Sequence, residues 1–304
     1  MNETVLGIKV DADTDRGTRI GVANLLDLFA DLGISATFLF SLGPDNTGRA
    51  LRRIFRPGFL AKVLRTNVAG NYGLATLLNG VLWPGPHIGR RNEALLRAVR
   101  DAGHEVGIHC YDHIRWQDGL QTMRPEEVGR EFAEARDEFQ RIFGTPARTA
   151  GAAGWQANAH SLAAYDAAGL DYASDTRGRG PFFPVVAGRV MKTLQLPTTL
   201  PTLDELLGRD AFPEQALIPH YLDLLSAGGP HVMTVHAELE GMAHVEFFRA
   251  LLAAAREKGV RFQTLAEIAA SLGADRGSIP VCAMTEGQVD GRGGKLAGQG
   301  PAAP

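Results

Sequence analysis

Residues 5–13, VLGIKVDAD, form a short apolar run that ends in two aspartates, Asp11 and Asp13. The run predicts a β-strand, and the amphipathic stretch RIGVANLLDLFADLG at 19–33 predicts a helix whose last glycine suits a left-handed C-cap. This strand-and-helix unit recurs about seven times along the chain, with no long structureless gap. Such alternation predicts a parallel sheet covered by helices.

Two architectures fit this alternation, an open doubly wound sheet and a (β/α) barrel. Reactive side chains lie at or just past the C-terminal ends of several predicted strands: Asp11, Asp13, His109, Asp175 and His236. In a barrel these ends converge on one mouth, so their placement favours the barrel. Neither a G-x-G-x-x-G after the first strand nor a P-loop occurs, which removes the usual nucleotide-binding interpretation of an open sheet.

The composition is that of a globular protein with a large core, since 45% of the 304 residues are hydrophobic and 21% are charged. A net charge of −3 gives no global attraction to nucleic acid. Two cysteines, Cys110 and Cys282, are too few for a disulfide framework and indicate a reducing compartment. Neither a signal peptide nor an apolar run long enough to span a bilayer is found, so we expect a cytoplasmic protein.

An insertion at 46–91 interrupts the alternation between the second predicted strand and its helix. At 100° per residue its first part places Leu51, Ile54 and Phe55 on one side and four arginines on the other, Arg49, Arg52, Arg53 and Arg56. No acidic residue occurs between Asp45 and Glu93. A helix lying in a membrane interface needs such a basic face, although a packed helix with a solvated charged face fits equally. RNA binding is less favoured because stacking aromatics are few.

The C-terminal segment, residues 275–304, is rich in glycine and lacks helical periodicity. This composition predicts a flexible tail without a chemical role, following a barrel that occupies residues 1–274.

A histidine pair, His109 and His113, lies four residues apart in HCYDH at 109–113. Asp11 and Asp13 are two residues apart on a strand and therefore point to the same side, where one of them is expected to bind a cation or take a proton. Two nitrogens and a carboxylate oxygen leave open coordination positions, as a catalytic metal site requires. Each piece alone also has an ordinary explanation, helix-capping acids or an incidental pair of histidines.

Seven segments between residues 4 and 270 together resemble the polysaccharide deacetylase family: KVDADTDRGTR, SLGPDNTGR, EVGIHCYDHIRWQ, AAGWQA, SDTRG, LPTTLPTLDELLGRD and TVHAELEG. The resemblance implies a distorted (β/α) barrel that holds a divalent metal ion and hydrolyses an N-acyl group on a sugar. Within the family, the segments are most similar to members that remove the N-formyl group of 4-deoxy-4-formamido-L-arabinose linked to undecaprenyl phosphate. That activity implies a peripheral enzyme on the cytoplasmic surface of the inner membrane, in a step toward aminoarabinose modification of lipid A.

The resemblance also implies a role for each site residue. The implied metal ligands are Asp13, His109 and His113. Asp11 is implied as the general base, and His236 as the general acid with Asp175 as the carboxylate that orients it. The ligand set accepts Zn, Mn, Co or Fe.

Two features depart from the family pattern. DAD replaces a pair of adjacent aspartates, which leaves the division of roles between Asp11 and Asp13 open. AAGWQA at 152–157 replaces a motif that contains an arginine, so the group that steadies the base is not identified. A deacetylase of another sugar and a non-catalytic barrel that binds lipid phosphate remain the alternatives.

Several polar residues near these motifs keep two interpretations. Arg16 and Arg177 are candidates for contact with the lipid phosphate or for ordinary ion pairs. Trp155 is a candidate sugar platform or a packed ring. Glu238 and Glu240 are candidates for hydrogen bonds to the sugar or for helix caps.

Overall fold

The computed structural model describes residues 4–50 and 76–303, and only the backbone of residues 274–276. The predicted basic helices of the insertion fall largely in 51–75 and so lie outside the described residues. The large sheet is built on β1 (Thr4–Ala12), which is parallel to all three of its partners. β9 (Gly229–His236) pairs along nearly the whole of β1, whereas β10 (Arg261–Gln263) and β2 (Thr37–Ser41) pair with its first and second halves.

From β2 the sheet continues through β3 (Glu105–Cys110), β4 (Thr149–Ala150), β5 (Tyr172–Ala173) and β8 (Leu194–Gln195), all parallel. The segment after β8 approaches β9 without forming a regular ladder. Thr199 N donates to Val232 O at 3.0 Å, and the hydroxyls of Thr198 and Thr234 lie 2.7 Å apart. The eight parallel strands therefore form a distorted barrel, which confirms the predicted fold class.

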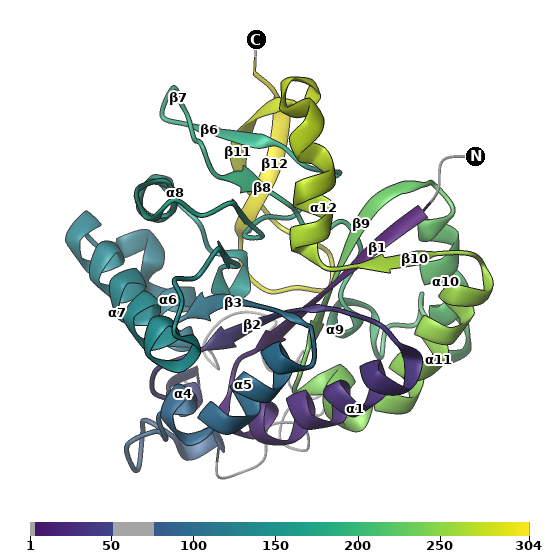
Figure 1. Cartoon of the computed structure of the whole chain (residues 1–304), viewed down its shortest axis with the longest axis horizontal. Helices are drawn as coiled ribbons and strands as arrows, with labels where there is room; N and C mark the ends of the chain where they lie inside the picture. Colours follow the sequence, from purple (N-terminus) through teal and green to yellow (C-terminus); the bar gives the residue numbers. More distant parts are fainter. Residues whose placement is uncertain (1–3, 51–75, 304) are drawn as a thin grey trace.

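Helices cover the outside of this sheet, with α1, α4 and α5 along one side of it (Figure 1). They are α1 (Ala23–Leu32), α4 (Ile88–Arg91), α5 (Glu93–Asp101), α6 (His113–Gly119), α7 (Pro125–Phe143), α8 (Ala159–Ala168), α9 (Leu203–Leu206), α10 (Glu214–Leu225), α11 (Val245–Glu257) and α12 (Leu265–Leu272). α1 and α7 end where their glycines, Gly33 and Gly144, adopt the left-handed conformation that the sequence predicts. The core lies between sheet and helices and includes Phe29, whose ring contacts those of Phe38 and Phe248 edge to face.

A second sheet corrects the prediction of a flexible C-terminal tail. β11 (Val281–Gly287) pairs parallel with β6 (Phe183–Val186), which also pairs with β7 (Arg189–Val190), and antiparallel with β12 (Leu296–Ala302). Figure 1 shows this sheet beside α12, on the opposite side of the barrel from α1 and α5. The prediction was wrong because the glycines serve the turn between the strands, where Gly291 and Gly294 have φ of 82° and 85°.

The run RVMKTLQLP at 189–197, predicted as one strand, is divided between the two sheets. Its first part forms β7 in the small sheet, and its last part forms β8 in the barrel. Among the helices that the structure describes, none has both the length and the apolar character needed to cross a membrane.

We expect Leu296→Ala to lower the free energy of unfolding by about 2 kcal/mol or more, because it removes a large side chain from a packed interior. Leu296 begins β12 and is only 3% exposed. Lys295→Ala is the matched control, since its ion pair with Glu286 is exposed and contributes little. Urea unfolding of both variants measures the difference, and equal midpoints would mean that the C-terminal segment is not packed.

Candidate active site

The strands of the barrel bring the predicted residues to one place. Lys9, Asp11 and Asp13 alternate on β1 and its C-terminal end, with their side chains on one face. His109 lies at the end of β3, and His113 is the first residue of α6. In the register between β1 and β9, Asp11 lies directly opposite His236. The fold thus brings distant residues together at one end of the sheet. Asp11 and His236, for example, are 225 positions apart in the sequence (236 minus 11).

Asp13, His109 and His113 form a compact set of candidate metal ligands. Asp13 Oδ1 lies 3.2 Å from His109 Nε2, and Asp13 Oδ2 lies 3.3 Å from His113 Nε2. One ligand atom from each residue fits within a spread of 4.8 Å. Atoms bound to a shared ion at about 2.1 Å have comparable separations. Asp13 Oδ1 is buried and accepts no hydrogen bond in the described part of the chain, so the three residues fit a divalent ion.

Neighbouring groups orient both histidines. His109 Nδ1 lies 2.7 Å from Gly151 O, and donation of its N–H there leaves Nε2 to face Asp13 as a ligand. Asp112 precedes His113 and caps α6 by accepting the Arg115 N–H at 3.0 Å. Asp112 is itself held by Asn46, whose amide donates to its Oδ2 at 2.6 Å. The position of His113 is therefore fixed by a helix cap.

Electrostatics favour the ionised form of Asp13, which a metal ligand needs, and the protonated form of His109. Burial alone would raise the pKa of Asp13, but the charge of His113 and the close contact with His109 hold it well below its ordinary range. Burial alone would lower the pKa of His109, but Asp11 and Asp13 raise it. A bound cation would take the place of the imidazole protons opposite the Asp13 carboxylate.

Glu238 braces the turn after β1. Its Oε1 accepts hydrogen bonds from Asp13 N at 3.1 Å and from Thr14 N and Oγ1 at 2.9 and 2.8 Å. Gly17 allows this approach, because a Cβ there would lie 1.9 Å from Glu238 Oε1. Burial, followed by the charge of Asp13, raises the pKa of Glu238 well above its ordinary value. Glu238 therefore holds the backbone of Asp13 and Thr14 in place.

Glu240 has a comparable role behind the candidate acid. It is fully buried, and its Oε2 accepts the backbone N–H of His236 at 2.8 Å. Burial raises the pKa of Glu240 to about 8, so the carboxyl is largely protonated at neutral pH. Glu240 therefore holds the end of β9 in place.

Asp11, the candidate base, is 2% exposed and lies beside a buried lysine. Its Oδ2 is 3.4 Å from the ammonium of Lys9, and its Oδ1 is 3.9 Å from His109 Nδ1. Oδ1 is buried and has no hydrogen-bond partner within residues 4–50 and 76–303. One carboxylate oxygen is thus paired with a cation and the other is available to a reacting group.

Asp175, predicted to orient His236, hydrogen-bonds other groups in this structure. Asp175 is fully buried and accepts hydrogen bonds from Ala152 N at 2.7 Å and from Gln195 Nε2 at 2.8 Å. Burial raises the pKa of Asp175 to about 6. His236 instead lies edge-on to Trp155, with ring centroids 6.3 Å apart. Asp175 consequently fixes the loop after β4, because the amide of Gln195 and the backbone of Ala152 occupy its carboxylate.

Trp155 is a packed ring. It is 1% exposed, and its indole N–H donates to Thr198 Oγ1 at 3.0 Å. Three cations surround the ring, with Lys9 Nζ at 5.2 Å, Arg177 Cζ at 5.3 Å and Arg292 Cζ at 4.2 Å from its centroid. The C-terminal segment, predicted to have no chemical role, therefore supplies Arg292 to the wall of the site.

The two candidate phosphate-binding arginines have protein partners. Arg177 forms an ion pair with Glu205 at 2.6 Å and donates to Leu200 O at 3.0 Å. Arg16 lies against Met242, with its guanidinium nitrogen 3.9 Å from the sulfur. These contacts favour the ordinary ion-pair interpretation for Arg177.

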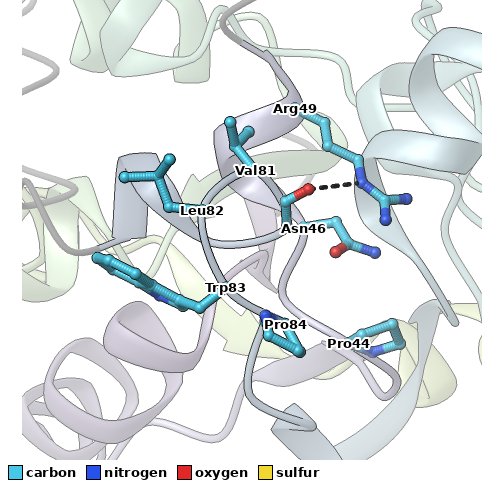
Figure 2. A pocket seen from close by; sticks show the side chains of 9 residues that line it. Pro44, Asn46, Arg49, Val81, Leu82, Trp83 and Pro84 are labelled. Carbon is cyan, nitrogen blue, oxygen red and sulfur yellow. Dashed lines mark hydrogen bonds between the residues drawn. The ribbon is translucent and has the colours of Figure 1, made fainter.

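A groove of about 480 Å³ lies at the base of the insertion (Figure 2). It is lined by Pro44, Asn46, Arg49 and residues 80–85. Three apolar side chains on its rim face solvent, with Val81, Leu82 and Trp83 exposed by 53%, 68% and 44%. Arg49 Nε donates to Gly80 O at 3.2 Å across the groove. Asn46 connects this groove to Asp112 and hence to the helix that begins with His113.

Known proteins match the chain along nearly its whole length. It is 37% identical over 299 residues to "Probable 4-deoxy-4-formamido-L-arabinose-phosphoundecaprenol deformylase ArnD" of Shewanella sediminis, covering 98% of this chain and 96% of that protein. It is 32% identical over 292 residues to the protein of the same name from Wigglesworthia glossinidia brevipalpis, covering 93% and 98%.

The fold is also that of a known structure, a probable polysaccharide deacetylase from Pseudomonas aeruginosa PAO1. The two superpose with a TM-score of 0.60 at 16% identity, over 89% of this chain and 91% of the other. The family model described as polysaccharide deacetylase matches residues 13–173, a stretch that runs from the first candidate ligand through both histidines. The chain belongs to the polysaccharide deacetylase family.

Proposed function

We propose that this protein is a metal-dependent deformylase. Its substrate would be 4-deoxy-4-formamido-L-arabinose linked to undecaprenyl phosphate, and its products formate and the free amine, in a step toward aminoarabinose modification of lipid A. The observation that carries the proposal is the cluster of Asp13, His109 and His113 beside Asp11 and His236. The names of the two similar proteins from Shewanella sediminis and Wigglesworthia glossinidia brevipalpis support this substrate.

Asp13, His109 and His113 would hold a divalent ion through one oxygen and two nitrogens, a set that suits Zn, Mn, Co or Fe. Such an ion supplies Lewis acidity, which activates water near neutral pH and stabilises negative charge on a carbonyl oxygen. The protein keeps the ligands in place through Gly151 O and the cap of α6.

Asp11 and His236 would handle the two protons of the reaction. Asp11 Oδ1 accepts a proton from the attacking water as the water oxygen bonds to the formyl carbon. His236, protonated on its imidazole, donates to the sugar nitrogen as the carbon–nitrogen bond breaks, because an amine leaves poorly without that proton. The water oxygen ends in formate, and the sugar keeps the amine.

A membrane-surface location would bring the barrel to a lipid-linked substrate. Val81, Leu82 and Trp83 expose an apolar rim beside Arg49, whose side chain is 48% exposed. Apolar side chains next to basic ones are suited to the interface of an anionic membrane. The protein would therefore lie on the cytoplasmic face of the inner membrane without spanning it.

The central prediction is formate release from the formamidoarabinose lipid. We expect the metal-loaded protein to release formate and a chelator to abolish the activity, which added Zn, Mn, Co or Fe would restore. His109→Ala should remain inactive after metal is added back, because one of the ligands is missing. His160→Ala changes an exposed histidine of α8 and serves as control. Acetate release from the N-acetyl analogue at an equal rate, or turnover that a chelator does not affect, would contradict the proposal.

His236→Gln should lower kcat on the formamide by about 10²-fold or more, since general acid catalysis contributes 10²–10⁴-fold. An O-formyl ester of the same sugar should lose much less, because its leaving alcohol needs less help from a proton donor. The ratio of the two losses tests the role of His236. Equal losses on both substrates would remove His236 as the acid.

Leu82→Ser with Trp83→Ser should weaken binding to vesicles of anionic lipid, measured by sedimentation, and leave hydrolysis of a short-chain soluble analogue unchanged. Val190→Ser is a matched control, because Val190 is also 51% exposed but lies on β7 in the small sheet. Unchanged vesicle binding of the double variant would place the membrane contact elsewhere.

A further inference from the structure

A buried lysine lies behind the candidate base. Lys9 is on β1, two residues before Asp11, and is completely excluded from solvent. Alternate residues of a strand share a face, so Lys9 points to the same side as Asp11 and Asp13. The steps assigned to Asp11, His236 and the metal ligands do not use this ammonium. Its presence in a dry interior therefore needs its own explanation.

The Lys9 ammonium is surrounded by groups that compensate its charge. Its Nζ lies 3.4 Å from Asp11 Oδ2 and donates to Ser174 O at 3.1 Å. It also lies 5.2 Å from the centre of the Trp155 ring. A buried ammonium is tolerated only where a counterion and hydrogen-bond acceptors replace water. Among the described residues, Asp11 is the carboxylate within ion-pair distance of this lysine.

The contact between Lys9 and Asp11 gives the two oxygens of the Asp11 carboxylate different surroundings. Oδ2 faces the ammonium, which fixes the rotation of the carboxylate. Oδ1 is left without a hydrogen bond from residues 4–50 or 76–303, on the side of His109. The ring of Trp155, on the other side of the ammonium, helps to hold it in this position. Lys9 thus places a cation directly behind the candidate base.

We propose that Lys9 is the positioning residue of the reaction and holds Asp11 Oδ2 so that Oδ1 is aimed at the attacking water. Lys9 acts only through Asp11 and touches neither substrate nor metal. The inference rests on the proposed function, because the role of Asp11 as base is part of that function.

A kinetic double-mutant cycle tests this role in the full-length, metal-loaded protein. Lys9→Met and Asp11→Asn should each lower kcat by about 10²-fold with little change in KM, since both disable the same base. The double variant should be no slower than Asp11→Asn, because nothing is left to position. Lys9→Arg, which keeps the charge, should retain more activity than Lys9→Met. Metal content should be unchanged in all variants, and the exposed Lys258→Met should behave as wild type.

Two kinetic outcomes would overturn the proposal. Multiplicative losses in the double variant would show that Lys9 and Asp11 act independently. Full kcat in Lys9→Met would show that the ammonium has no part in the reaction.

Thermal unfolding of the wild type, Lys9→Met, Asp11→Asn and the double variant forms a second cycle. This cycle separates failure of the inference about Lys9 from failure of the proposed function. Each single change leaves an unpartnered buried charge or polar group and should lower Tm, and the double change should recover part of that loss. If the wild type releases no formate, the proposed deformylase function is wrong and the catalytic role of Lys9 falls with it. The Tm cycle still decides the pairing in that case, because additive losses would show that Lys9 and Asp11 are not coupled.

Discussion

The burial of three charged residues on β1 and just past its end is the constraint on which the site depends. Lys9, Asp11 and Asp13 are at most 8% exposed, so each charge must be compensated by a neighbour. Lys9 and Asp11 compensate each other, and Asp13 is compensated by the two imidazoles brought by β3 and α6. The parallel pairing of β1 with β2 and β9 makes this possible, because it aligns the strand ends that carry the partners. The strand pairing that forms the barrel thus also places the charged residues of the candidate site.

A shell of buried acids surrounds this centre and accepts hydrogen bonds from its backbone. Glu238 holds the turn after β1, Glu240 holds the end of β9, and Glu131 accepts the N–H of Asp112 at 2.8 Å. Burial raises the pKa of Glu131 to about 7 and that of Glu240 to about 8. Both carboxyls bind protons more tightly in the folded than in the unfolded state. Their contribution to stability is therefore full at low pH and is lost as pH rises through these values.

Much of this architecture could be predicted from local sequence patterns. The predicted strand EVGIHC coincides with β3, and the proline and glycine that bound α7 predicted its ends within one residue. Asp13, His109 and His113 could be predicted as one set of metal ligands, because Asp13 and His109 lie at the ends of clearly apolar strands and His113 belongs to the same family motif as His109. The lengths of β4 and β5 could not be predicted in this way. Each strand has only two residues, and its bounds depend on pairing with other segments of the chain.

What the sequence did not reveal depends on contacts between distant segments. The glycine-rich C-terminal segment forms strands because β6, about a hundred positions earlier, offers an edge to pair with. Asp175 follows a strand as His236 does, yet Gln195 and Ala152 occupy its carboxylate, which no local pattern encodes. Lys9 could have been found from its spacing of two from Asp11, but its burial could not.

The pairing of β1 with β9 also sets the order in which the molecule can be completed. Thr4 lies opposite Gly229, so β1 can pair with β2 early, but three quarters of the chain must be synthesised before β9 can pair with it. Contacts so distant in sequence make folding slow. On the ribosome, β1 carries both apolar and charged groups and would remain without β9 while residues 13–228 are being synthesised. A nascent chain of this kind is expected to depend on chaperones until β9 emerges.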